Sequence, residues 1–421
     1  MRISAILFIV LAWFIQTTKG QTTGWQQKDF IITMWCPPPA SDENFQILKR
    51  DGYNLTNISL GEDKRVTFNE FAKSLDIANR HGLKTLIVNQ LLQPSMLDDS
   101  VKKMELDNLI DGIKRHPALE GYFLIDEPNA SSFAGWGKLT KYIKEKDPDH
   151  LTYLNLFPNY AKQNDLDVFP AKKWISSKKM YTEYLKLYTE HVPVELFSYD
   201  HYNFFKNKKD GSQYFLNLSM IAAAAEKAKV PFINIVQACT ILPYWRLPNE
   251  DELRWLAYTT MTYGAHGISW FLYWGPASYG GCYQDGKRMP IADHVARINQ
   301  EIKALGPELM KLTSTRIYHS GHLPVGTNRI PKESTVKVSG GSFILGFFKE
   351  NNLENAFMIT NRDYKKTAIA NITFETGNRK LLEYSIEKCC WDTVKNIQKG
   401  NILTLELRPG AGKLFKFGEI Q

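Results

Sequence analysis

The feature that most constrains this fold is a regular alternation of short apolar segments with longer amphipathic ones. Between residues 30 and 311, eight segments rich in β-branched and aromatic residues are each followed by a stretch whose apolar positions have helical spacing. Strands that alternate with helices pair in parallel, because the chain must cross over to return to the same edge. Eight such units in about 250 residues predict an α/β fold of the (β/α)8 barrel type. The predicted strands are 30–35, 54–59, 84–89, 119–125, 152–157, 194–199, 232–236 and 267–273.

A doubly wound open sheet is the alternative α/β architecture for this alternation. That fold places a glycine-rich turn after its first strand, where a helix N-terminus binds phosphate. Here the first predicted strand runs into Cys36, Pro37, Pro38 and Pro39, a sequence that cannot open a helix around phosphate. The barrel is therefore the preferred prediction, and no nucleotide cofactor is expected.

The pattern of apolar residues changes after about residue 313. Short alternating apolar segments follow one another there, separated by turns that contain Gly, Asn and Asp. This pattern is typical of a small all-β sandwich. We expect a signal peptide at 1–20, a catalytic barrel at 21–312 and a C-terminal β-sandwich domain at 313–421.

The first twenty residues indicate export. Arg2 precedes an apolar run, and small or polar residues follow up to Gly20, as in a secretory signal peptide. We therefore expect a secreted or periplasmic protein without stable membrane insertion after cleavage. The net charge is +8 with no long run of like charges, which does not indicate a nucleic-acid partner. The five cysteines have no metal-binding spacing, so no metal is expected, and nothing in the sequence indicates an oligomeric state.

Chemistry in such a barrel lies at the carboxyl ends of the strands. The residues that follow the eight predicted strands are rich in carboxylates, amides and aromatic rings. Amides can hydrogen-bond sugar hydroxyls, and rings can stack on sugar faces. The ends also carry Tyr160 and Tyr273, and Glu62 is a more distant carboxylate. The candidate substrate-binding residues are Trp35, Asn89, Asn159, His201, Tyr202, Gln237, Trp270 and Trp274.

The fourth strand carries the most informative motif, Gly121-Tyr-Phe-Leu-Ile-Asp-Glu-Pro128. An apolar run ends abruptly in Asp126 and Glu127, and the proline stops the strand. A carboxyl at the apolar end of a strand is expected to have a raised pKa, which suits a general acid. A structural role for these acids, such as capping the next helix, is the competing interpretation.

The segment GYFLIDEPN resembles the fourth-strand acid/base motif of the large clan of TIM-barrel glycoside hydrolases that includes β-galactosidases, cellulases and mannanases. The segment GISWFLYWGP is similar to the eighth strand of that clan, with its sugar-stacking Trp. The resemblance implies a glycoside hydrolase that cleaves a polysaccharide or glycan without a cofactor. It also implies that Glu127 is the general acid/base.

The chain departs from the clan at two positions. The clan has Asn before this Glu, where Asp126 stands here, and its nucleophilic Glu ends strand seven, where Gln237 stands here. The second catalytic carboxylate is then either Asp200, in a motif that also resembles the sixth strand of family 18 chitinases, or Asp126. An Asp-Glu pair resembles that of β-hexosaminidases, in which the substrate's acetamido group attacks. A carbohydrate-binding pseudoenzyme on a glycosidase scaffold is the alternative function.

Overall fold

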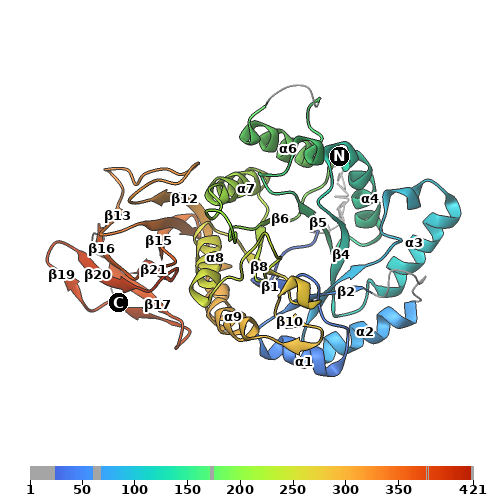
Figure 1. Ribbon diagram of the computed structural model, residues 1–421, viewed down its shortest axis with the longest axis horizontal. Coiled ribbons are helices and arrows are strands. Elements are labelled where there is room, and N and C mark those ends of the chain that lie inside the picture. Colours follow the sequence, from blue (N-terminus) through green and yellow to red (C-terminus); the bar gives the residue numbers. More distant parts are fainter. Residues whose placement is uncertain (1–23, 60–67, 171–174, 376, 378, 419–421) are drawn as a thin grey trace, which may run out of the picture.

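The computed structural model describes residues 24–59, 68–170, 175–375, 377 and 379–418. The predicted signal peptide and Glu62 lie outside these residues. Figure 1 shows a barrel of parallel strands surrounded by helices, with a separate body of antiparallel strands beside helices α8 and α9. Within the described residues, no helix is long and apolar enough to cross a membrane.

The eight predicted strands form one parallel sheet, which confirms the barrel prediction. Their order is β1-β8-β7-β6-β5-β4-β3-β2, so sequence neighbours are also neighbours in space. The strands are β1 (Ile31–Met34), β2 (Leu55–Ser59), β3 (Lys84–Val88), β4 (Leu119–Asp126), β5 (Leu151–Leu156), β6 (Phe197–His201), β7 (Phe232–Gln237) and β8 (Gly267–Phe271).

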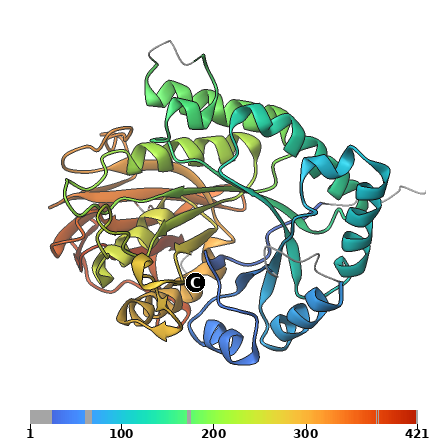
Figure 2. The same cartoon turned by 45° about the vertical axis from the view of Figure 1, so that its right-hand side comes forward.

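Helices pack around the outside of the sheet, as Figure 2 shows from a second direction. Several begin where the sequence supplies a cap: Asn249 and Glu252, for example, form a capping box at the start of α8. The helices are α1 (Asp42–Arg50), α2 (Phe68–Arg80), α3 (Ser100–Ile113), α4 (Phe133–Lys146), α5 (Gln163–Leu166), α6 (Ser177–His191), α7 (Tyr214–Ala228), α8 (Glu250–Thr262) and α9 (Pro290–Leu309), with short 3-10 turns η1 (Pro94–Leu97), η2 (Ala130–Ser132) and η3 (Ala277–Tyr279).

The barrel closes between β1 and β2 through one side chain. The Ile32 amide donates to Asn54 Oδ1 at 2.8 Å, and Asn54 Nδ2 donates to the Phe30 carbonyl at 2.8 Å. The Asn54 amide also donates to the Ile32 carbonyl at 3.1 Å. Asn54 therefore replaces part of the ladder that the other strand pairs form with backbone groups alone.

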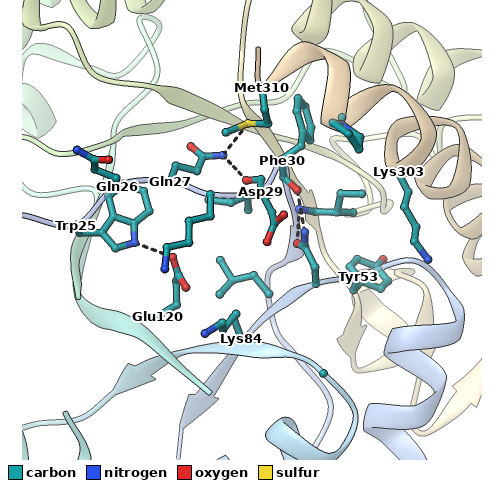
Figure 3. Close-up of a pocket in the computed structure, with 18 of the residues that line it drawn as sticks. Trp25, Gln26, Gln27, Asp29, Phe30, Tyr53, Lys84, Glu120, Lys303 and Met310 are labelled. Carbon is teal, nitrogen blue, oxygen red and sulfur yellow. Dashed lines mark hydrogen bonds between the residues drawn. The ribbon is translucent and has the colours of Figure 1, made fainter. Parts of the chain in front are cut away.

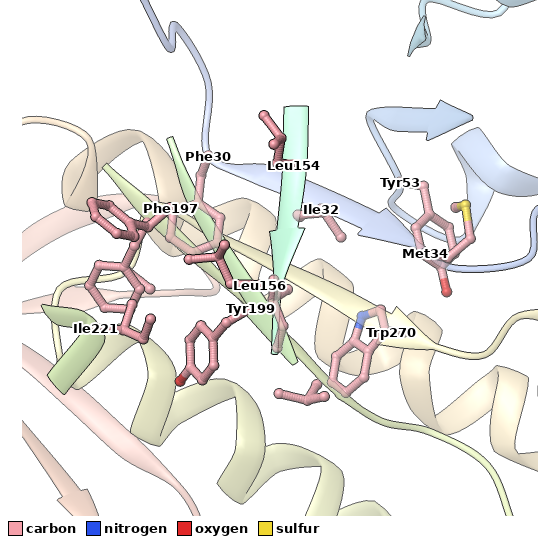
Figure 4. Close-up of a cluster of buried hydrophobic side chains, with 14 of the residues drawn as sticks. Phe30, Ile32, Met34, Tyr53, Leu154, Leu156, Phe197, Tyr199, Ile221 and Trp270 are labelled. Atoms are coloured by element: carbon pink, nitrogen blue, oxygen red, sulfur yellow. The ribbon is translucent and has the colours of Figure 1, made fainter. Parts of the chain in front are cut away.

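Apolar side chains fill the space between the sheet and its helices. Figure 4 shows part of this core, where Phe197 and Tyr199 of β6 lie near Ile221 of α7. Trp270 of β8 belongs to the same buried cluster and is fully enclosed. This packing fixes where each strand ends and hence where the polar side chains beyond it are placed.

The C-terminal part is a sandwich of two antiparallel sheets, which confirms the predicted all-β architecture. The larger sheet has the order β12-β14-β15-β21-β17-β18 and the smaller β13-β16-β20-β19. Their strands are β12 (Thr313–His319), β13 (Val336–Ser339), β14 (Phe343–Glu350), β15 (Leu353–Asn361), β16 (Ala368–Phe374), β17 (Lys380–Ser385), β18 (Cys390–Thr393), β19 (Ile397–Gln398), β20 (Ile402–Leu407) and β21 (Gly412–Gly418). A small sheet, β9 (Trp274–Gly275), β10 (Tyr283–Gln284) and β11 (Lys287–Arg288), follows β8.

The larger sheet has two buried faces. Phe343 and Leu345 of β14 point into the sandwich, whereas Ile344 belongs to the apolar cluster of the barrel. Gly346, the next residue of β14, lies so close to α8 that a Cβ would stand 2.2 Å from the Thr262 carbonyl oxygen. The sandwich therefore packs directly on a barrel helix.

Strand β6 differs from its prediction by a few residues. It was expected over 194–199 and is found at Phe197–His201. Asp200 and His201 are consequently part of the strand and almost completely buried, instead of following it in an open loop. The five cysteines are unpaired. Cys389 has φ of 51°, in the left-handed region, and precedes the strand that begins at Cys390.

Candidate active site

The end of β4 has an unusual backbone at its second carboxylate. Glu127 has φ of 46°, in the left-handed region that favours glycine, and its amide donates to the Asn155 carbonyl on β5 at 2.8 Å. Pro128 follows and ends the strand. A glutamate held in this conformation costs about 1–3 kcal/mol, and such backbone strain clusters at functional sites. The Glu127 side chain reaches across β5 to a hydrogen bond with Asp200 of β6.

Three carboxyls are gathered around the buried amide of Asn155. Asn155 Nδ2 donates to Asp126 Oδ1 at 3.0 Å and to Asp200 Oδ1 at 3.1 Å. Its Oδ1 accepts from the Ser198 hydroxyl at 2.9 Å, which fixes the orientation of the amide. The third carboxyl, Glu127, is hydrogen-bonded to that of Asp200.

The Glu127–Asp200 pair holds a proton near neutral pH. Burial, the charge of Glu127 and that of Asp126 raise the pKa of Asp200 well above its usual range. Burial and the nearby Asp126 charge raise the pKa of Glu127 to about 7, while the hydrogen bond from Asp200 acts in the opposite direction. The two acids titrate as a unit, because the hydrogen bond between them requires a proton on one of the two carboxyls.

Asp126 differs from the other two carboxyls in its surroundings. It is exposed at the barrel mouth, whereas Glu127 is half-buried and Asp200 is 4% exposed. Although the residue as a whole is exposed, partial burial of its carboxyl raises the pKa of Asp126, and the hydrogen bond from the Asn155 amide opposes that effect. A pocket of about 410 Å³ opens beside Asp126, lined also by Asn89, Gln90 and Trp136.

An aromatic wall stands on the side of β6 to β8. We use this name for Tyr202, Trp245 and Phe271. The ring centroids of Tyr202 lie 4.4 Å from those of Trp245 and 5.0 Å from those of Phe271. Tyr202 follows Asp200 by two residues, so the wall adjoins the carboxyls. Half-buried rings of this kind can stack on the apolar face of a sugar.

Trp35 extends the aromatic surface toward β4. Its ring lies 6.5 Å from Phe271 and 5.6 Å edge-on from Phe123 of β4, and it is half-buried. Tyr160, which is 43% exposed, accepts a hydrogen bond from the Tyr202 amide at 3.3 Å. The structure thus brings together the predicted Trp35 and Tyr202 with the predicted carboxylates Asp126, Glu127 and Asp200.

His201 and Asn159 lie below the open mouth. His201 is 1% exposed, and burial lowers its pKa to about 4, so the ring is neutral at neutral pH. Asn217 Oδ1 accepts from the Asn159 amide at 2.8 Å, so His201 Nδ1, 2.9 Å from the same oxygen, must be the protonated nitrogen. The buried Asn159 side chain has no hydrogen-bond partner among the described residues. It is a polar group that a ligand or water could satisfy.

Gln237, Trp270 and Trp274 have contacts that lead away from the mouth. Gln237 is fully buried and makes four hydrogen bonds to the backbone of the loops after β6 and β7. Trp270 is also fully buried, and its indole donates to Asn299 of α9 at 2.8 Å. Trp274 stacks on Tyr283 at 5.2 Å. These three side chains support the loops and the core in this structure, although substrate contacts were expected of them.

Asn89 is partly engaged by its own turn, since its Oδ1 accepts from the Leu91 amide at 2.8 Å. Tyr273 is buried, with its ring against Tyr53. Within the described part of the chain, no three His, Cys, Asp or Glu side chains are grouped so that they could hold a metal ion.

A larger pocket of about 1040 Å³ lies at the opposite end of the barrel, where the strands begin (Figure 3). There the Trp25 indole donates to Glu120 at 2.6 Å, and Lys84 and Lys303 line the rim. The described residues that line it include none of the three grouped carboxyls, so the candidate site is the mouth beside Glu127.

Sequence reasoning missed three residues of the site. Asn155 was hidden because it lies inside β5, and only the register of β4, β5 and β6 shows that its amide reaches two acids. Trp245 and Phe271 were assigned no role, although Trp245 stands in the aromatic-rich segment Tyr244-Trp245 after β7. That segment was a usable signal.

Comparisons with known proteins found similarity only among solved structures. No family model and no curated protein matches the chain. The solved structures similar to it include several glycoside hydrolases. A candidate α-L-fucosidase from Bacteroides thetaiotaomicron aligns at 12% identity over 62% of this chain and 87% of its own, with a TM-score of 0.42. An endoglucanase from Pseudomonas stutzeri aligns at 12% identity over 62% and 85%, with a TM-score of 0.40.

A β-galactosidase from Marinomonas ef1 aligns at 11% identity over 67% of this chain, with a TM-score of 0.39. The alignment spans 61% of that enzyme's length. Identities of 11–12% and TM-scores of 0.39–0.42 are too low to carry an argument about this chain. The arrangement of the three carboxyls is what indicates an activity.

Proposed function

We propose that this protein is a secreted glycoside hydrolase that cleaves a polysaccharide or glycan, with Glu127 as the general acid/base. The observation that carries the proposal is the hydrogen-bonded Glu127–Asp200 pair beside the exposed carboxyl of Asp126. An acid whose pKa is near 7 can hold a proton at neutral pH and donate it to a glycosidic oxygen.

Asp126 is the better second catalytic carboxylate. Two hydrogen-bonded carboxyls lie closer together than the separation of about 5 Å that a retaining displacement needs, which argues against Asp200 as an independent nucleophile opposite Glu127. Asp126 is exposed and lines the pocket of about 410 Å³. In this role it stabilises or attacks the positive anomeric centre, or orients a substrate group that attacks. Asp200 then tunes the proton affinity of Glu127.

The aromatic rings near the carboxyls contribute to sugar binding and not to bond cleavage. Trp35 and the aromatic wall present apolar faces next to the acids, at a position where a sugar would place its C–H face. Neutral His201 and the unpartnered side chain of Asn159 offer polar groups nearby. The proposal of secretion rests on the N-terminal sequence, in which an apolar run follows Arg2.

The experiment is a screen of the wild-type protein on aryl glycosides and polysaccharides, followed by Glu127→Gln and Asp126→Asn on the best substrate. Loss of a general acid is expected to lower kcat by about 100-fold or more, because this group contributes about 10²–10⁴. Asp149→Asn, which changes an exposed acid at the other end of the barrel, is the matched control. Full activity of Glu127→Gln would refute the assigned role.

A carbohydrate-binding pseudoenzyme is the second candidate. It is favoured by one observation: β7 ends in Gln237, whose buried side chain is bonded to loop backbone, so that strand supplies no carboxylate. Calorimetric binding of a glycan with no sugar released over days would favour this function. Released sugar that disappears in Glu127→Gln would exclude it.

A further inference from the structure

The two loops that carry the aromatic wall are bound to each other. Phe205, after β6, forms an antiparallel bridge with Trp245, after β7. The Lys206 amide donates to the Tyr244 carbonyl at 3.0 Å. A displacement of one loop is therefore expected to displace the other, and with them both Tyr202 and Trp245.

A half-buried ion pair joins the same two loops. Arg246 Nη2 lies 3.0 Å from Asp210 Oδ2, and its Nη1 lies 2.7 Å from Glu252 of α8. Asp210 Oδ1 accepts from the Phe205 amide at 3.3 Å. Asp210 is thus the acid that ties the β6 loop to the residue following Trp245.

The C-terminal domain supplies the third partner of that acid. Tyr364, in the turn between β15 and β16, donates its hydroxyl to Asp210 Oδ2 at 2.6 Å. Its ring packs edge-on against Phe204 at 5.5 Å and against Trp255 of α8 at 5.3 Å. The turn is held in place by Asn361, whose Nδ2 donates to the Lys366 carbonyl at 2.9 Å.

We propose that Tyr364 is a positioning residue for the aromatic wall, so that the β-sandwich is a working part of the site. This inference rests on the proposed glycosidase function. Tyr364 does not reach the carboxyls; it acts through Asp210 on the loops that carry Tyr202 and Trp245. Its contribution is therefore to binding of the sugar ring and not to proton transfer.

The test compares Tyr364→Phe, which removes only the hydroxyl, with Tyr384→Phe in the same domain. Tyr384 is a buried ring packed edge-on against Trp391, and no hydrogen bond between described residues involves its hydroxyl. Both variants are made in the full chain labelled with 5-fluorotryptophan, and Trp245→Phe assigns the Trp245 signal in the fluorine NMR spectrum. Melting temperatures verify that both variants fold.

Tyr364→Phe is expected to shift or broaden the Trp245 signal and leave Trp136 of α4 unchanged, whereas Tyr384→Phe leaves both unchanged. In Tyr364→Phe the Trp255 signal is expected to move whether or not the inference holds, because the Trp255 ring packs directly against Tyr364. An unchanged Trp245 signal in Tyr364→Phe would overturn the inference, whether or not a substrate has been found.

Kinetics on the best substrate give the second readout. Loss of one hydrogen bond to a charged acceptor is expected to raise KM roughly fivefold to tenfold, with kcat and its pH profile unchanged. An unchanged KM would overturn the positioning role and leave a purely structural contact. Failure of the proposed function has a separate signature, namely no turnover by the wild-type protein, and it does not alter the Trp245 result.

Discussion

At the scale of single residues, the site depends on one backbone conformation and one amide. Glu127 leaves β4 with a positive φ, and Asn155 on the next strand donates to both neighbouring acids. A Glu in that conformation is unfavourable on its own, so the fold stabilises a state that local sequence preference opposes. The benefit is a carboxyl that keeps its proton near neutral pH.

The raised pKa of Glu127 predicts a pH-dependent stability. From its usual value of 4.5 up to about 7, the folded protein retains a proton that the unfolded chain has released, so stability falls as pH rises through this window. The amide in Glu127→Gln cannot titrate. This variant should therefore be more stable than the wild type at about pH 7.5, and its advantage should be smaller at about pH 5. Asp126 and Asp200 have raised values too, so part of the slope remains.

Urea unfolding of both proteins at the two pH values measures this difference. A stability difference that is the same at both would contradict the raised pKa. Asp149→Asn serves as the control, because its carboxyl lies at the far end of the barrel.

At the scale of elements, the strand ends decide which side chains can react. Gln237 is the last residue of β7, the position at which the glycoside hydrolase clan that the motifs resemble has its nucleophile. Its side-chain amide donates to the carbonyls of Phe204, Cys239 and Arg246. A carboxylate at that position would face three carbonyl oxygens. The side chain at this strand end therefore supports the loops after β6 and β7.

Gln237→Glu is expected to destabilise the protein by about 3 kcal/mol or more and not to create a nucleophile, because buried hydrogen bonds are lost and a charge is left unpaired. Chemical denaturation measures the first effect. Gln93→Glu, an exposed position in the β3–η1 loop, is the control. A stable Gln237→Glu variant with increased activity would contradict this account.

The seam of the barrel gives a second prediction at this scale. Asn54→Ala removes the bonds to the Ile32 amide and the Phe30 carbonyl and should cost about 2–3 kcal/mol. Asn57→Ala, in strand β2, which Asn54 immediately precedes, removes no such pair of bonds among the described contacts and should cost less. Equal losses for the two variants would show that the seam does not depend on Asn54.

The sequence predicted the elements better than their ends. The eight strands, the sandwich and the Asp126-Glu127 motif follow from periodicity, since apolar spacing reports which face is buried. Strand β6 was placed a few residues early because Val194 and Leu196 continue its apolar pattern backwards. That displacement hid the burial of Asp200. Contacts across strands, such as those of Asn155, depend on register, which one sequence does not reveal.

At the scale of the whole molecule, the two domains share a core. Helix α8 is buried along most of its length, with Leu256 and Met261 in the barrel cluster that also contains Ile344, Met358 and Leu414 of the sandwich. Arg254, 3% exposed, is paired with Glu250 of its own helix and with Glu301 of α9. A helix covered on both sides cannot be exposed to water without a large loss of apolar burial.

The close approach of Gly346 to α8 provides the sharpest test of that shared core. In Gly346→Ala the new methyl would stand 2.2 Å from the Thr262 carbonyl oxygen, so sheet and helix must separate, at a cost of about 3 kcal/mol. Gly135→Ala is the matched control, since its methyl would meet Pro94 at an ordinary 3.4 Å and it lies within helix α4. We expect a single, lowered unfolding transition for Gly346→Ala and an equal or higher one for Gly135→Ala. Two separate transitions would show instead that the barrel and the sandwich unfold independently. Tyr364 would then not be held firmly enough against the barrel to position the aromatic wall.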